Sequence, residues 1–221
     1  MNVTYRQLLE MEIQSNNSIS IPLPRIVRHL TIHASFVPDI GLYHGKIGIV
    51  LFFAHYARFT GNPLYNEFAG ELLDEVYNEI NTGLPVNFEY GLCGIGWGIE
   101  YLLQNGFMEG DSDEILSDID AIVMERNLRR ITDRSIKTGL GGISYYISKR
   151  INSPCRKSGN LPFDETYLAD WTSTASSIVI PEDKVIFDTM IGVLPEGEDL
   201  TLWKRGLENG CAGVGLKSML L

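Results

Sequence analysis

The chain alternates segments that are apolar on every side with segments whose apolar residues follow a helical period. Residues 47–54 are apolar throughout, which is typical of a helix enclosed by other helices. In residues 64–80 the apolar positions recur every three or four residues, and acidic residues fill the opposite side. The pattern predicts an inner apolar helix followed by an outer amphipathic helix whose acidic face lies in water.

The same order of segments recurs twice more along the chain. An inner segment at 95–103 precedes an outer segment at 111–123, which begins with an aspartate N-cap and an acidic first turn. A third inner segment at 143–147 precedes an outer segment at 164–178, whose apolar stripe is weaker because serine and threonine are poor helix formers. We therefore expect helical hairpins arranged in tandem.

Other segments flank these hairpins. Short helices are predicted at 4–15 and after Pro22, whereas residues 179–206 are irregular and fit either an insertion or a degenerate repeat. A last inner segment runs from Gly210 to Leu221, and no outer segment follows it. This segment leaves an apolar edge, which either the N-terminal segment or another subunit, including a second copy of the chain, would cover.

Each inner segment begins with Gly-x-x-Gly followed by a β-branched residue. The four motifs are Gly45-Lys46-Ile47-Gly48-Ile49, Gly91-Leu92-Cys93-Gly94-Ile95, Gly139-Leu140-Gly141-Gly142-Ile143 and Gly210-Cys211-Ala212-Gly213-Val214. Their first glycines lie 46, 48 and 71 residues apart, a period typical of a repeated supersecondary unit. Glycine at a helix start serves turning and close packing, which is the interpretation we favour, or exposes N–H groups to an anion.

Composition narrows the class of protein. With 44% hydrophobic residues, the 221 residues can form one domain over 1–221. The net charge of −10 argues against binding to nucleic acid or an anionic membrane and favours a cationic or neutral partner. No basic stretch feeds an apolar one near Met1, and the longest apolar run is too short to cross a bilayer, so we expect a cytoplasmic protein without membrane insertion.

Candidate chemistry rests on few residues. The three cysteines, Cys93, Cys155 and Cys211, lack CxxC spacing and are interpreted as reduced thiols. All four histidines lie in the first quarter of the chain, and His44 stands beside a motif. If the motifs converge in space, His44, Cys93 and Cys211 could together bind a zinc ion. The interpretation that we favour is that the thiols are core residues and that the backbone satisfies His44.

Residues 41–49, 91–96 and 209–216 resemble the inner-helix motifs of lanthionine synthetase C-like (LanC-like) proteins, and the resemblance covers most of residues 40–221. It implies an α/α toroid, in which a ring of inner helices is surrounded by outer ones. Full family enzymes have seven hairpins and cyclise peptides by adding a cysteine thiol to a dehydrated serine or threonine. Their zinc, held by one cysteine and an adjacent Cys-His pair, activates the thiolate, while histidine and aspartate assist proton transfers.

This chain departs from that pattern in two respects. Four motifs indicate a short or incomplete all-α toroid of about four hairpins, and no Cys-His dipeptide occurs. We therefore assign no catalytic or cofactor-binding residue beyond His44 as a candidate, and we expect no cofactor. The leading hypothesis is a non-catalytic LanC-like pseudoenzyme that binds a peptide or small protein in a peptide-modification or export system, with a central cavity that holds a segment of the substrate.

Two enzyme hypotheses stay open beside it, together with a purely structural role. One is a zinc-dependent thioether cyclase that uses the residues named above. The other is a glycoside-processing toroid, which needs two carboxylates facing a cleft about 5 to 10 Å apart. Glu89 and Glu100 flank one motif, but nothing in the sequence pairs them.

Overall fold

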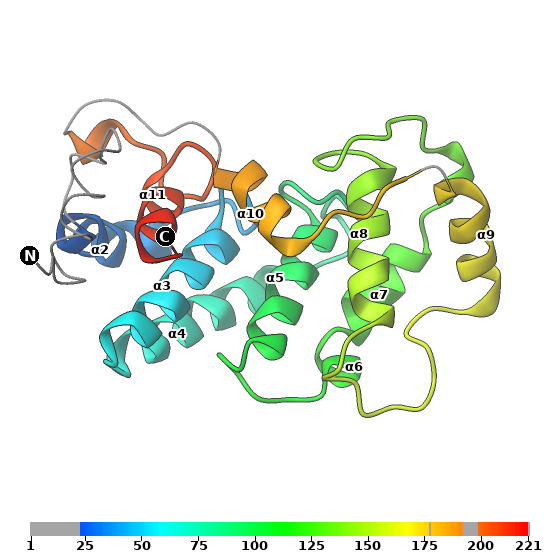
Figure 1. The fold of residues 1–221 in the computed structure, drawn as a ribbon, viewed down its shortest axis with the longest axis horizontal. Helices are drawn as coiled ribbons and strands as arrows, with labels where there is room; N and C mark the ends of the chain where they lie inside the picture. Colours follow the sequence, from blue (N-terminus) through cyan, green and yellow to red (C-terminus); the bar gives the residue numbers. More distant parts are fainter. Residues whose placement is uncertain (1–22, 177, 192–198, 221) are drawn as a thin grey trace, which may run out of the picture.

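The computed structural model describes residues 23–176, 178–191 and 199–220 (Figure 1). Within these ranges the chain is helical, and its one β-interaction is an isolated bridge between Lys204 and Gly210. The all-α prediction is confirmed. The helix expected at 4–15 lies outside the described residues.

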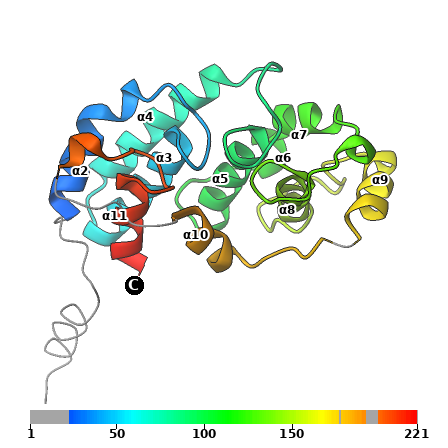
Figure 2. The ribbon, with the colours of Figure 1, turned by 90° about the horizontal axis from the view of Figure 1, so that it is seen from above.

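Four inner helices begin immediately after the first glycine of the four motifs. They are α3 (Lys46–Thr60), α5 (Leu92–Gln104), α8 (Leu140–Ile151) and α11 (Cys211–Leu220). Contacts join α8 to α5, α5 to α3, and α3 to α11. In space the inner helices therefore run in the order α8, α5, α3, α11, although α11 comes after α8 in the sequence. The inner helices form an arc, with α8 and α11 toward its two ends (Figures 1 and 2).

Each inner helix packs against an outer partner. The partners are α4 (Leu64–Glu79) on α3, α7 (Ser117–Met124) on α5, α9 (Glu165–Ala175) on α8 and α2 (Leu23–His33) on α11. The second outer helix, predicted as one element over 111–123, is broken at Leu116 into α6 (Ser112–Ile115) and α7. The arrangement is an arc of an α/α toroid.

The apolar edge expected on the last inner helix is covered from the other end of the chain. Helix α2 contacts α11, and its residues Ile26, Val27 and Leu30 are buried. Leu216 on α11 is fully buried, whereas Leu220 at its end is half-exposed. Of the two coverings that the sequence allows, the structure shows the N-terminal one.

The irregular region 179–206 contains α10 (Asp183–Ile191) and a 3-10 turn, η3 (Leu200–Leu202). Helix α10 contacts α11, and its Phe187 ring packs 5.6 Å from Trp97 and 5.0 Å from Tyr101, both on α5. Trp97 also lies against Tyr145 of α8. Aromatic side chains therefore fill the space beside the inner helices, where the sequence had suggested a central cavity.

The Gly-x-x-Gly motif has a clear structural purpose. In every repeat the first helical N–H donates to a backbone carbonyl seven residues earlier, so the preceding loop folds back over the helix start. These pairs are Lys46 to Asp39, Leu92 to Pro85, Leu140 to Asp133 and Cys211 to Lys204, at 2.8 to 2.9 Å. Because the backbone takes these amides, they are not available to an anion.

Glycine is required because the loop lies so close to the helix. A Cβ on the second glycine of each motif would stand 2.0 to 2.5 Å from the carbonyl oxygen six residues earlier, for example 2.1 Å for Gly94 against Phe88. No other residue fits without moving the backbone.

Two buried cations join inner to outer helices. The guanidinium of Arg150 on α8 is fully buried and contacts Asp120 of α7 at 2.7 Å and Glu100 of α5 at 3.1 Å. The ammonium of Lys46 on α3 lies 2.9 Å from Glu75 and 3.0 Å from Glu79, both on α4. Part of the acidic face predicted for the 64–80 helix therefore faces a buried lysine.

A first prediction concerns the helix starts. Gly94→Ala should lower the free energy of unfolding by about 1–3 kcal/mol, because its Cβ clashes with a backbone carbonyl. Gly70→Ala is the matched control: it lies within α4 with nothing near its Cβ, and should raise that energy by up to about 1 kcal/mol. Urea unfolding measures both, and equal effects would contradict the close-approach account.

A second prediction concerns the buried arginine. Arg150→Met should cost about 3–5 kcal/mol of unfolding free energy, because it leaves Asp120 and Glu100 buried without their cation. Arg126→Met, at an exposed position, should change stability little. The same urea titrations test this pair, and a small effect at Arg150 would show that the network is not a structural link.

Candidate functional site

The loops before the four inner helices meet at one place. The residues two positions before the first glycine of the motifs are Tyr43, Glu89, Lys137 and Glu208. The N–H of Glu208 donates to the carbonyl of Tyr43 at 2.9 Å, that of Tyr43 to Glu89 at 3.0 Å, and that of Glu89 to Lys137 at 2.9 Å. Backbone hydrogen bonds thus join the loops in the same order as the helices beneath them.

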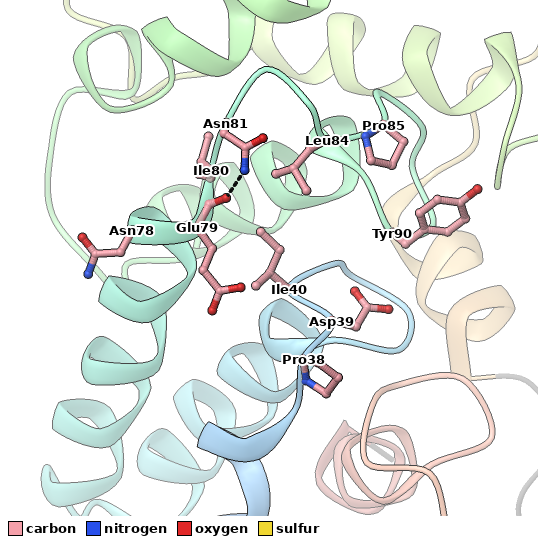
Figure 3. Close-up of a pocket in the computed structure, with 10 residues that line it drawn as sticks. All are labelled: Pro38, Asp39, Ile40, Asn78, Glu79, Ile80, Asn81, Leu84, Pro85 and Tyr90. Carbon is pink, nitrogen blue, oxygen red and sulfur yellow. Dashed lines mark hydrogen bonds between the residues drawn. The ribbon is translucent and has the colours of Figure 1, made fainter.

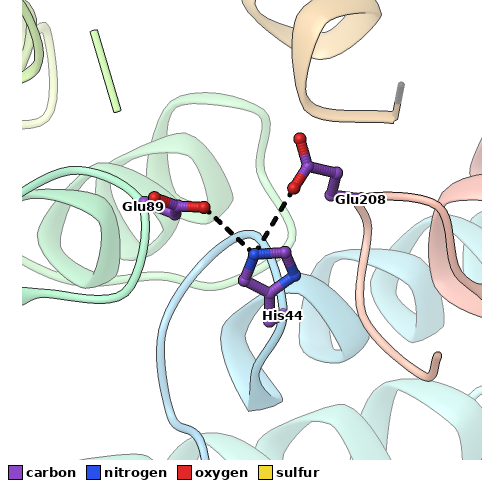
Figure 4. A group of neighbouring side chains, drawn as sticks. All are labelled: His44, Glu89 and Glu208. Atoms are coloured by element: carbon purple, nitrogen blue, oxygen red, sulfur yellow. Dashed lines mark hydrogen bonds and ion pairs between the residues drawn. The ribbon is translucent and has the colours of Figure 1, made fainter. Parts of the chain in front are cut away.

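His44 lies between two of these side chains. Its Nε2 atom is 3.1 Å from Oε1 of Glu89 and 3.4 Å from Oε2 of Glu208 (Figure 4). The imidazole is 28% exposed and each carboxylate 17%, so solvent reaches the group. The sequence led us to expect that the backbone satisfies His44, whereas two carboxylates from separate loops contact it.

Lys137 completes the group, which we call the loop cluster (His44, Glu89, Lys137 and Glu208). Its ammonium contacts the carboxylate of Glu208 and lies 3.6 Å from Oε1 of Glu89. The same ammonium stands 5.0 Å from the centre of the Tyr43 ring, a cation–π contact. One ammonium faces two carboxylates, so the loop cluster has a net negative charge when the imidazole is neutral.

The Tyr43 ring lies next to the loop cluster. Its side chain is fully buried, and its hydroxyl has no hydrogen-bond partner. Burial, followed by the charges of Glu208 and Glu89, raises the pKa of Tyr43 far above its ordinary value. The hydroxyl therefore keeps its proton and remains a donor near two carboxylates.

The two cysteines suggested as zinc ligands lie elsewhere. Cys93 and Cys211 are fully buried, and the potential ligands that gather at His44 are Glu89 and Glu208. Burial raises the pKa of Cys93 well above its ordinary value and that of Cys211 to about 11. These shifts agree with the interpretation of both thiols as core residues.

The carboxylate pair considered for a glycosidase is also not assembled. Glu89 faces His44, whereas Glu100 is buried and contacts Arg150. Sequence reasoning missed Lys137 and Glu208 altogether. Both residues stand at the same position as Glu89, two residues before the first glycine of a motif. This shared position is the sequence signal that could have identified them.

A groove adjoins the loop cluster. It measures about 480 Å³ and lies between the loop at 38–40 and the end of α4 with the loop that follows it (Figure 3). Tyr90, which directly follows Glu89, forms one end and is 43% exposed. The lining residues are Pro38, Asp39, Ile40, Asn78, Glu79, Ile80, Asn81, Leu84, Pro85 and Tyr90.

Comparison with known proteins gives one match. The family model described as "Lanthionine synthetase C-like protein" matches residues 37–199, from the loop before α3 to the start of η3. No curated protein and no solved structure matches. In the described ranges, no helix combines the length and apolarity needed to cross a membrane. Since the match spans most of the chain and the helices have the expected arrangement, the chain belongs to the lanthionine synthetase C-like family.

Proposed function

We propose that this protein binds a peptide segment within a peptide-modification or export system and does not itself form thioether bonds. The observation that carries the proposal is the groove beside the loop cluster, with Tyr90 exposed at one end. Its volume suits a few side chains of an extended peptide. An exposed aromatic ring next to a groove is a frequent anchor in protein interfaces.

The walls of the groove indicate the chemistry of the peptide. Ile40, Ile80 and Leu84 offer an apolar surface, and Asp39 and Glu79 supply carboxylates, of which that of Glu79 also contacts Lys46. The chain as a whole has a net charge of −10, which favours the approach of a cationic peptide. The expected ligand therefore carries an apolar residue next to a lysine or arginine.

Two observations support a binding role without catalysis. The thiols of Cys93 and Cys211 are buried and lie outside the loop cluster. Trp97 and Phe187 pack against each other beside the inner helices. A peptide is therefore better accommodated in the groove than inside the arc. The sequence favoured a central cavity as the binding place, and the proposal moves it to the groove.

A third prediction tests the groove. We expect fluorescently labelled 15-residue peptides, each with an apolar residue next to a lysine or arginine, to bind, as measured by anisotropy. Tyr90→Ala should weaken the tightest peptide by about tenfold or more, because it removes an interface aromatic. Leu202→Ala, at an apolar residue that is more exposed than Tyr90 and lies outside the groove, should leave affinity unchanged. Absence of binding to the unmodified protein, or equal loss in both variants, would overturn the proposal.

A fourth prediction tests the thiols. Iodoacetamide should label Cys155, which is partly exposed, in the folded protein, and should label Cys93 and Cys211 only after unfolding. The reason is that burial hides these two thiols and suppresses their thiolate form. Peptide mass spectrometry with and without urea measures the order. Fast labelling of Cys93 or Cys211 in the native protein would favour thiol chemistry.

A further inference from the structure

We propose that His44, Glu89 and Glu208 form a binding site for a divalent cation of the Zn²⁺ type, built from one imidazole nitrogen and two carboxylate oxygens. This inference does not rest on peptide binding. It also differs from a thiolate centre, because none of the three ligands is a cysteine and each comes from a different loop (Figure 4).

Two of the three distances between ligand atoms already suit such an ion. Zinc bonds of about 2.0–2.2 Å in tetrahedral geometry place neighbouring ligand atoms roughly 3.3–3.6 Å apart. The distances from Nε2 of His44 are 3.1 Å to Glu89 and 3.4 Å to Glu208, and all three ligand atoms lie within 4.8 Å of one another. A small rotation of the carboxylates would complete three of four positions, and water would take the fourth.

The chemistry of the donors agrees with this geometry. Both carboxylates approach the same nitrogen, Nε2. A cation can replace the proton on Nε2, with the remaining imidazole proton on Nδ1. A mixed imidazole and carboxylate set is typical of zinc and related transition metals, whereas magnesium and calcium favour oxygen alone.

Tyr43 provides a second and independent observation. Its hydroxyl is buried and has no hydrogen-bond partner, an uncommon state for a polar group. Carboxylates that bind metals are usually held by a further hydrogen bond. The ring that carries this unpartnered hydroxyl lies 5.0 Å from the Lys137 ammonium and 6.4 Å from the His44 ring.

Lys137 occupies the place of a cation when no metal is bound. Its ammonium faces both carboxylates, yet its side chain is 35% exposed and has room to turn into solvent. Lysine and metal therefore compete for the same negative charge. This competition distinguishes a metal site from an ion-pair cluster that only fastens the loops, because removal of Lys137 should strengthen metal binding and weaken a fastening cluster.

The test uses the full chain, stripped of metal, with Zn²⁺ affinity measured by competition with a chromophoric chelator. We expect one Zn²⁺ per chain. Glu208→Gln should weaken binding by about tenfold or more, because it removes a charged ligand, and Lys137→Met should strengthen it by about tenfold. Glu114→Gln, at an exposed acid outside the loop cluster, should have no effect. His44→Asn is the substitute variant if Glu208→Gln does not fold.

Cysteine variants and cobalt distinguish the donors. Cys93→Ser and Cys211→Ser should retain the Zn²⁺ affinity, and the Co²⁺ complex should lack a thiolate-to-metal charge-transfer band. Absence of stoichiometric zinc in the unmodified protein, an unchanged affinity in Glu208→Gln, no strengthening in Lys137→Met or a thiolate band would each overturn the inference. Peptide binding measured with a chelator present separates this result from the proposed function.

Discussion

The fold depends on one backbone contact, made four times. A loop folds back over the start of each inner helix, and its carbonyl accepts the first helical N–H. The contact needs a second glycine one turn into the helix, because the carbonyl six residues earlier occupies the space of a Cβ. Through this contact each loop is placed on the end of its own helix, and neighbouring loops are brought within hydrogen-bond distance of one another.

The loop cluster follows from that arrangement. Every repeat places the residue two positions before its first motif glycine where the four loops meet. The chemistry at this junction therefore depends on which amino acids stand at that position. In this chain they are a buried tyrosine, two glutamates and a lysine, with His44 one place nearer its glycine. The capping contact uses backbone atoms alone, so it places no requirement on these side chains.

The sequence predicted the first repeat well because its apolar stripe over 64–80 is long and regular, and α4 forms there. The break at Leu116 was missed, since the N-cap of α6 is visible in sequence but the end of a single turn is not. The structure places Glu89 and Glu208, rather than Cys93 and Cys211, beside His44 for a positional reason. Cys93 and Cys211 follow their motif glycines and so lie within helices, whereas only residues before the glycines meet at the junction.

Helix α2 is remote in sequence from the α11 helix that it covers. In an ordinary tandem-repeat protein, each unit contacts only its neighbours, and the terminal units can fray independently. Here the first and last described helices share an interface, so unfolding of one end of the chain removes contacts from the other end. The end of the arc that contains α2, α3 and α11 should therefore unfold as one unit, and its folding must await contacts of high sequence separation.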